Sequence, residues 1–181
     1  ALALWGAGAA GGDPELARFV AAAVEVWHNW TLVHDDIIDD DDFRRGVPST
    51  HCALKRYALA NYPVGEERAV RFGRDFAILT ADLQQSWANH LVMRSREIGV
   101  GADAVLAILE RMQRLGGAGV ISGEAIDVEV EYRNDVTEAT VERILYLKTG
   151  ALLEFAVTAG AMAGLNTADA GIPPVAALGR F

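Results

Sequence analysis

The sequence predicts an all-α protein, and three observations support this prediction. Strand signals are nearly absent, since apolar and polar residues rarely alternate over short runs. The helix formers Ala, Leu, Glu and Arg dominate the chain. Apolar residues recur at the spacing of one helix face. We therefore expect a helical bundle, a fold that builds its sites from side chains on facing helices.

The first helices are expected from local signals. The segment 1–12 is small and apolar and resembles the middle of a helix. Asp13-Pro14-Glu15 combines an N-cap, a proline at the first helical position and an acid in the first turn. The helix that follows carries an apolar stripe, which we expect to pack mainly in the core. The stripe consists of Leu16, Phe19, Ala23, Trp27 and Trp30.

Breaks and turns divide the rest of the chain into further helices. Gly46-Val47-Pro48 breaks the chain, and residues 61–65 and 99–101 form loops. Residues 133–135 form a turn, after which Thr137 opens a helix. The expected helices cover residues 50–60, 66–98, 102–131 and 137–164, with a last one opened by Ile172-Pro173-Pro174.

The bulk composition predicts a single globular domain over residues 1–181. The chain is 51% hydrophobic and 23% charged, and it shows no internal repeat or interdomain linker. The net charge of −9 argues against nucleic acid as a partner. The single cysteine, Cys52, excludes an internal disulfide and fits a reducing cytoplasm. The apolar run 151–165 contains Glu154 and is too short to span a bilayer, so we expect a soluble protein.

The most informative segment runs from His34 to Gly46 and holds six carboxylates within eight positions. Asp35 and Asp39 are four residues apart and fall on one helix face, one turn from each other. Carboxylates at this spacing suit Mg²⁺, which prefers oxygen ligands and retains substrate phosphates in its shell. Arg44 and Arg45 suit the phosphate oxygens themselves, because guanidinium groups bind phosphate in a bidentate way. The segment therefore predicts a metal-bridged diphosphate site.

A solvated acidic loop is the alternative, since runs of like charge usually have that role. Two features of the chain argue against it. The run follows directly on the apolar stretch Trp30-Thr31-Leu32-Val33, and it ends in a basic pair rather than in a Ser/Gly linker.

The same residues resemble a known family. Asp35 to Gly46, followed by Pro48-Ser49-Thr50-His51, is similar to the first aspartate-rich motif of the trans-isoprenyl diphosphate synthases: DDxxD, an acidic spacer, a hydrophobic residue and RRG. Tyr146-Leu147-Lys148-Thr149-Gly150 resembles the family's KT motif. Ser122 to Asp127 resembles its GQxxD motif, with Glu124 where Gln is usual. The resemblance covers almost the whole chain and implies a large antiparallel helical bundle with the active site in its central cavity.

The resemblance also implies the reaction and the role of the first motif. Isopentenyl diphosphate is condensed with an allylic diphosphate, with Mg²⁺ as the cofactor. Asp35 and Asp39 would bind Mg²⁺ directly, and Asp36 would support that shell from beside it. Arg44 would contact the allylic diphosphate, and Arg45 the isopentenyl diphosphate.

The other two motifs receive roles in the same way. Lys148 would contact the allylic diphosphate, and the Thr149 oxygen would lie near the developing allylic cation. Asp127 would lie near the metals through water. Glu124 would add a negative charge that either strengthens the metal field or repels diphosphate. The histidines show no zinc spacing with other ligands, so we expect hydrogen-bonding roles for His28, His34, His51 and His90.

The length of the product is expected to depend on residues that precede the motif. Trp30 and Thr31 lie five and four residues before Asp35, a little over one turn below it on nearly the same face. A prenyl tail that grows away from the metals would reach them. Trp30 would act as a floor while Thr31 leaves space, which favours geranylgeranyl over farnesyl diphosphate. Ordinary core packing is the alternative role for Trp30.

Two other classes of protein compete with the synthase as the function of this chain. A class I terpene cyclase shares the DDxxD motif but binds no isopentenyl diphosphate, and a non-catalytic partner subunit would only pack against an active synthase.

We also expect a homodimer through the apolar helix 66–98, with Phe72, Phe76 and Trp87. Two further family segments, GGKRxRP and a second aspartate-rich motif, would lie before Ala1 and after Phe181, so we expect the chain by itself to be inactive.

Overall fold

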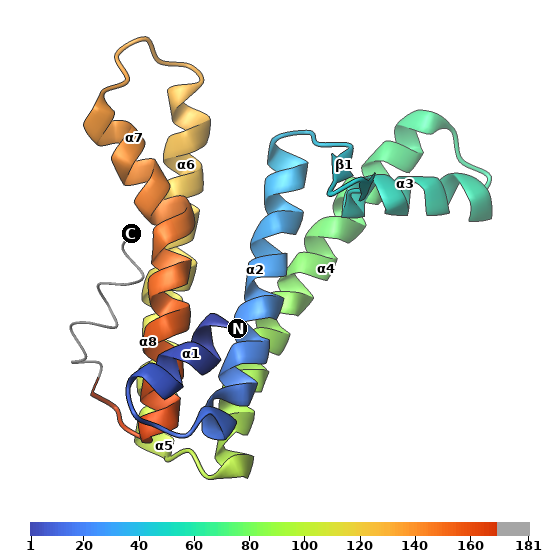
Figure 1. The fold of residues 1–181 in the computed structure, drawn as a ribbon. Helices are drawn as coiled ribbons and strands as arrows, with labels where there is room; N and C mark the ends of the chain where they lie inside the picture. The colour runs from blue at the N-terminus through green and yellow to red at the C-terminus, as the bar shows by residue number, and fades with distance from the viewer. Residues whose placement is uncertain (170–181) are drawn as a thin grey trace. The chain divides into compact units, whose positions relative to one another are not determined.

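The computed structural model describes residues 1–169, and these residues are almost entirely helical (Figure 1). The α-helices are α1 (Leu2–Ala9), α2 (Arg18–Ile38), α3 (Thr50–Asn61), α4 (Glu66–Arg94), α5 (Ala102–Arg111), α6 (Val120–Val130), α7 (Glu138–Leu145) and α8 (Ala151–Leu165). Between them lie the 3₁₀ turns η1 (Pro14–Ala17) and η2 (Ser95–Ile98), the π-helical segments η3 (Met112–Gly119) and η4 (Tyr146–Gly150), and a hairpin of β1 (Phe43–Arg44) and β2 (Val47–Pro48). The predicted all-α class is confirmed.

Most of the expected starts and stops are found, with one shift. The Asp13 side chain accepts a hydrogen bond from the backbone N–H of Glu15, as an N-cap does, but it opens the 3₁₀ turn η1. Helix α2 begins only at Arg18. Thr137 caps α7 by accepting a hydrogen bond from the Thr140 N–H. The expected helix at 172–174 lies outside the described residues.

The described residues divide into two compact units. The first comprises Ala1–Glu25 with the chain from Ala88 onward, and the second comprises Val26–Trp87. Helices α2 and α4 contribute residues to both. The expectation of a single domain over 1–181 stays a prediction.

In the first unit, α1 packs against α8 at a contact made of small residues (Figure 1). A Cβ atom on Gly6 would lie 2.1 Å from the backbone oxygen of Val157, and one on Gly160 would lie 1.9 Å from that of Ala3. Only glycine allows two backbones to approach so closely. Helix α8 is buried on nearly all sides, with Phe155 and Met162 among its fully buried side chains.

Helix α8 belongs to a longer apolar helix, and much of the apolar part of that helix is buried. Helix α8 continues α7 and η4 without a break, so that Glu138–Leu165 is long and apolar enough to cross a membrane by length and composition. The length of the apolar run alone is therefore not a sufficient argument against a span. However, 56% of the apolar window is buried inside the protein, which is typical of a core helix.

In the second unit, α4 turns a stripe of small residues inward. Ala69, Ala77 and Ala81 are fully buried, and a Cβ on Gly73 would lie 2.3 Å from the His51 backbone oxygen of α3. This spacing of four residues places the small side chains on one face of α4. Several of its larger apolar residues lie elsewhere on the helix and are exposed, so the apolar content of α4 does not all serve the core of this unit. The exposed ones include Phe76, Leu79, Leu83 and Trp87.

Candidate active site

The predicted metal ligands lie at the C-terminal end of α2, in the second unit. Asp35 and Asp36 are in the last turn of the helix, and Asp39 follows it. The Asp39 N–H still donates to the Asp35 carbonyl oxygen at 2.9 Å, so the helical register continues through this point. Asp35 and Asp39 are therefore one turn apart, as the sequence predicts. Asp36 is 3% exposed, whereas Asp39 is open to solvent.

The chain reverses at the end of α2 and so brings Arg44 back to these carboxylates: Asp40 has a positive φ of 57°, and the Asp41 N–H donates to the Asp36 carbonyl oxygen at 3.0 Å. A tight hairpin turn follows Arg44. Arg45 and Gly46 both have positive φ, 53° and 81°, which is the conformation of a two-residue type I′ turn. The Arg44 guanidinium donates to Asp36 Oδ1 at 2.5 Å and to Asp35 Oδ2 at 2.6 Å. Burial alone lowers the pKa of Arg44, but the hydrogen bonds that it donates to Asp36 and Asp35 outweigh burial and raise the pKa. The turn leaves Arg45 exposed to solvent at the tip of the hairpin.

This hairpin is the main local difference from the expected structure. Gly46-Val47-Pro48 does interrupt the helices, but it does so inside a pair of two-residue strands, in which Phe43 is opposite Pro48 and Arg44 is opposite Val47. The signal that would have found the hairpin is Arg45-Gly46, a residue followed by Gly between the two short segments Phe43-Arg44 and Val47-Pro48. The hairpin separates the roles of the two arginines, since Arg44 faces the carboxylates and Arg45 faces solvent.

The two residues predicted to limit product length lie one turn below Asp35. Trp30 is 7% exposed and packs edge to face on Trp27, with ring centroids 5.0 Å apart. Its ring also meets that of His34 at 5.6 Å. Thr31 is partly buried and donates to the His28 carbonyl oxygen at 2.7 Å. Trp30 is thus held firmly in an aromatic group beneath the acidic residues.

His34 packs between the acidic motif and α4. Its Nε2 atom lies 3.9 Å from Asp82 Oδ1. Burial lowers the pKa of His34, and the charge of Asp82 raises it by a smaller amount. The lowered pKa favours the neutral ring at neutral pH, which fits the hydrogen-bonding role expected from the sequence.

A second cluster of predicted residues forms in the first unit. Lys148 Nζ lies 2.7 Å from Asp127 Oδ2 and 2.9 Å from Glu124 Oε2. The structure thus brings together the two motifs that carry these residues, on α6 and η4. Thr149 is exposed beside Lys148. Glu124 therefore acts as an anionic partner of Lys148. The presence of Glu124 where the motif usually has Gln did not by itself predict this pairing.

Two backbone features allow this cluster to form. A Cβ atom on Gly123 would lie 2.4 Å from the backbone nitrogen of Lys148, so α6 and η4 can approach only because residue 123 is a glycine. The segment η4, which holds Lys148 and Thr149, is a π-helix. Wide turns of this kind occur often at functional sites, because they displace side chains from the regular helical positions.

A buried polar network lies next to η4, and the sequence did not predict it. Glu154 is 8% exposed, accepts a hydrogen bond from the Tyr146 hydroxyl at 2.9 Å, and lies 3.5 Å from the Arg111 guanidinium. Arg111 directly precedes η3, and Tyr146 begins η4. One buried carboxylate therefore connects the starts of both π-helical segments. Its signal was a charged residue inside an otherwise apolar run.

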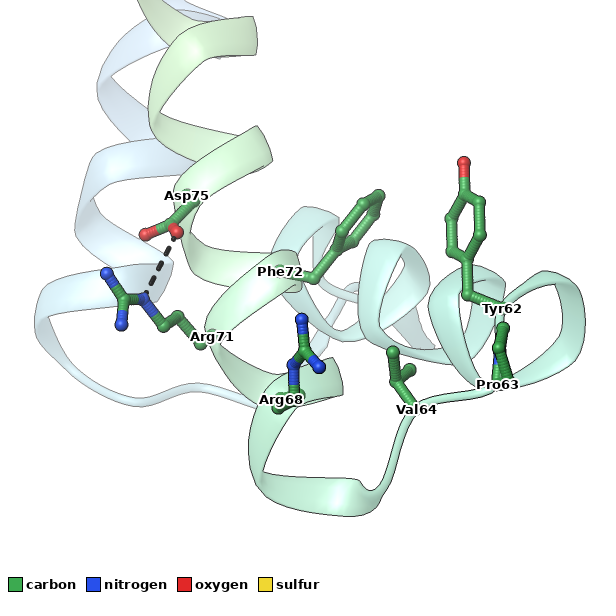
Figure 2. A pocket seen from close by; sticks show the side chains of 7 residues that line it. All are labelled: Tyr62, Pro63, Val64, Arg68, Arg71, Phe72 and Asp75. Carbon is green, nitrogen blue, oxygen red and sulfur yellow. Dashed lines mark ion pairs between the residues drawn. The ribbon is translucent and has the colours of Figure 1, made fainter.

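The second unit also contains an open groove of about 600 Å³ between the end of α3 and the start of α4 (Figure 2). Arg71 and Asp75 form an ion pair of 3.6 Å at one side of it, and Tyr62 stands at the other. The groove is lined by Tyr62, Pro63, Val64, Arg68, Arg71, Phe72 and Asp75. None of these belongs to the predicted site residues, so the groove is not the site that the motifs describe.

Comparisons with known proteins identify the family of the chain. The polyprenyl synthetase family model matches residues 2–179, and the chain belongs to this family. The chain is 36% identical over 163 residues to a short chain isoprenyl diphosphate synthase of Methanothermobacter thermautotrophicus, covering 90% of this chain and 43% of that protein. The chain thus spans less than half the length of that relative.

Solved structures give the same result for the fold. A geranylgeranyl pyrophosphate synthetase from Pyrococcus horikoshii matches with a TM-score of 0.80 and 31% identity, over 99% of this chain and 48% of that one. A geranylgeranyl pyrophosphate synthase from Corynebacterium glutamicum, solved with isoprenyl diphosphate and magnesium, matches with a TM-score of 0.79 and 27% identity, over 90% and 46%. The fold is that of the isoprenoid synthases, as the sequence predicts.

Proposed function

We propose that the full-length protein is a trans-prenyltransferase that condenses isopentenyl diphosphate with an allylic diphosphate. Its product would be a short prenyl diphosphate of about fifteen to twenty carbons. The observation that carries this proposal is the end of α2, where Asp35 and Asp39 lie one turn apart and a guanidinium is bound to Asp35 and Asp36. Such an arrangement suits the binding of cations and of the phosphates that accompany them.

The residues of this chain fit Mg²⁺. The donors are carboxylate oxygens, which a hard cation prefers. Asp35 and Asp36 already hold a positive charge in the form of the Arg44 guanidinium, so their oxygens are arranged around a cation. Asp35 and Asp39 would hold the ion, with Asp36 fixing Arg44 beside them. When bound, Mg²⁺ would neutralise charge on the diphosphate leaving group.

The protein side chains would do the rest of the work. The allylic C–O bond breaks to give a carbocation and diphosphate, the double bond of isopentenyl diphosphate attacks, and a proton is lost. Arg44 and Lys148 would bind the allylic diphosphate, and Arg45 would bind the isopentenyl diphosphate. The Thr149 oxygen would stabilise the developing cation by its dipole. Asp127 would orient Lys148, which it contacts at 2.7 Å.

The experiment that tests the proposal compares reactions with and without isopentenyl diphosphate. The full-length protein is incubated with an allylic diphosphate and Mg²⁺, and the products are separated by chromatography. A synthase elongates the chain only when isopentenyl diphosphate is present. Cyclic hydrocarbons formed without it would identify a terpene cyclase instead. No turnover, with activity restored only by adding another synthase, would identify a partner subunit.

Glu124→Gln should strengthen the binding of diphosphate by about two- to fivefold, the range expected when one partly exposed ion pair is removed. Lys148 shares its charge between Asp127 and Glu124, so loss of one carboxylate leaves more of it for phosphate. The measurement is a calorimetric titration of inorganic pyrophosphate in the presence of Mg²⁺. Glu129→Gln, an exposed glutamate of the same helix beside Arg133, is the control. Weaker binding by Glu124→Gln would show that Glu124 supports the metals.

Trp30→Ala should shift the product spectrum toward longer chains. The ring is buried one turn below Asp35, and its removal leaves space of the kind a longer prenyl tail would fill. The products of the intact enzyme are resolved by chromatography, with Trp5→Ala, a tryptophan that is 69% exposed, as the control. An unchanged spectrum from a folded Trp30→Ala variant would show that the tail runs elsewhere and that Trp30 serves the core.

The full-length protein should be a homodimer that uses the exposed face of α4. Phe76, Leu79 and Trp87 are 46%, 60% and 54% exposed, and burying them would be favourable. Light scattering should give twice the monomer mass at micromolar concentration. Leu79→Glu should yield a monomer, whereas Leu106→Glu, at an equally exposed leucine of α5, should not. A wild-type monomer would refute this interface.

The single cysteine fits a cytoplasmic location, which we propose as well.

A further inference from the structure

Three side chains that can bind metal come together at the base of the hairpin in the second unit. Asp42 precedes β1, while His51 and Cys52 lie in the first turn of α3. Their ligand atoms all lie within 4.8 Å of one another. No zinc spacing surrounds His51 in the sequence, because the hairpin rather than helical spacing brings Asp42 to the group.

The surroundings of Cys52 are unusual for a cysteine that merely fills space. Its thiol is 8% exposed but donates to Asp42 Oδ1 at 3.0 Å. The Oγ atom of Ser49, itself buried, lies 3.3 Å from Nδ1 of His51. The sulfur is thus placed among polar atoms, whereas inert buried cysteines pack against apolar ones.

We propose that Asp42, His51 and Cys52 form a binding site for a borderline-soft divalent cation of the Zn²⁺ class, separate from the Mg²⁺ site of Asp35 and Asp39. Thiolate and imidazole ligands select such ions over Mg²⁺, which prefers oxygen alone. A tetrahedral ion needs ligand atoms roughly 3.5 Å apart, so small side-chain movements would complete the site. The thiol proton passes to the buffer on binding. Asp42 is exposed and gives the ion a path of entry.

A bound ion would close the base of the hairpin. Asp42 and Ser49 are already joined there by a backbone hydrogen bond of 3.0 Å from the Ser49 N–H to the Asp42 carbonyl oxygen. The ion would add a second connection, between Asp42 and the start of α3. The segment between these two points carries Arg44 and Arg45. The site would therefore fix the loop that presents both arginines, whatever reaction the protein performs.

The test uses Co²⁺ as a spectroscopic probe on the tag-free, metal-free protein. Cys52 is the only cysteine of residues 1–181, so a sulfur-to-cobalt charge-transfer band that these residues give reports on Cys52. We expect the band to appear with Co²⁺, to be removed by Zn²⁺, and to survive an excess of Mg²⁺. Absence of the band at saturating Co²⁺, or its loss to Mg²⁺, would overturn the proposal.

Variants distinguish a site of several ligands from Co²⁺ binding by the Cys52 thiol alone. Asp42→Ala changes an exposed residue, and it should weaken Co²⁺ binding by about tenfold or more in a variant that keeps the helical circular dichroism of the wild type. Cys52→Ser should abolish the band. His90→Ala, at an exposed histidine of α4, should bind Co²⁺ like the wild type. Wild-type affinity in Asp42→Ala would also overturn the site. The result is independent of prenyl transfer, because no substrate is present.

Discussion

Asp39→Ala should lower the turnover of the full-length enzyme by at least about a hundredfold, the scale of removing one preorganised electrostatic group from an active site. Asp35→Ala should have a similar effect, because the two carboxylates share one helix face. The variants should also weaken Mg²⁺-dependent binding of the allylic diphosphate, since Asp35 and Asp39 would hold the ion that offsets the charge of the diphosphate. Steady-state kinetics over a range of Mg²⁺ concentrations measures both effects.

Asp36→Ala and Asp41→Ala are the matched comparisons within the same acidic run. Asp36 is buried against Arg44, so Asp36→Ala should lower the free energy of unfolding by about 2 kcal/mol. Its effect on turnover should be smaller than that of Asp35→Ala or Asp39→Ala. Asp41 is exposed, and its replacement should leave turnover within about twofold of the wild type. Equal losses of turnover in all four variants would contradict the assignment of Asp35 and Asp39 as the ligands.

Among substitutions that add one methyl group to the cluster of Lys148, Asp127 and Glu124, Gly123→Ala should be the most destabilising. The new Cβ would lie 2.4 Å from the Lys148 nitrogen and 2.7 Å from the Leu147 carbonyl carbon, which are backbone atoms that cannot rotate away. We expect a loss of about 1–3 kcal/mol in the free energy of unfolding, the usual cost of overpacking. Urea denaturation measures the loss, and pyrophosphate titration reports the displacement of Lys148.

Gly119→Ala is the control for this prediction. A Cβ on Gly119 would meet the Ala151 Cβ at 3.5 Å, an ordinary contact. Alanine is also the better helix former, so stability should not fall. If Gly123→Ala unfolds at the same urea concentration as the wild type, the close approach of α6 and η4 is not a requirement of the fold.

Much of the fold could be predicted from the sequence because helix signals are local. The N-caps Asp13 and Thr137 act on residues two or three positions away, and both were correctly identified. The spacing of Asp35 and Asp39 is likewise a property of one helix. Arg44 lies nine residues after Asp35, so a single reversal of the chain suffices to bring the two together.

The features that could not be predicted depend on contacts between distant segments. The π-helical segments η3 and η4 carry no local signal, since their wide turns are stabilised by tertiary packing such as the contact at Gly123. The role of Glu154 depends on Arg111, more than forty positions earlier in the chain. The pairing of Glu124 with Lys148 likewise joins two motifs that are apart in sequence. Periodicity within one element contains no information about such pairs.

The most direct test of the central claim is the Mg²⁺ dependence of chain elongation by the full-length protein. An allylic diphosphate and isopentenyl diphosphate are supplied together, and the products are weighed by mass spectrometry with Mg²⁺ and with a chelator in its place. We predict prenyl diphosphates longer by one or more isopentenyl units in Mg²⁺ and none in the chelator. Equal elongation in both conditions, or no elongation in Mg²⁺ by a folded protein, would contradict the account.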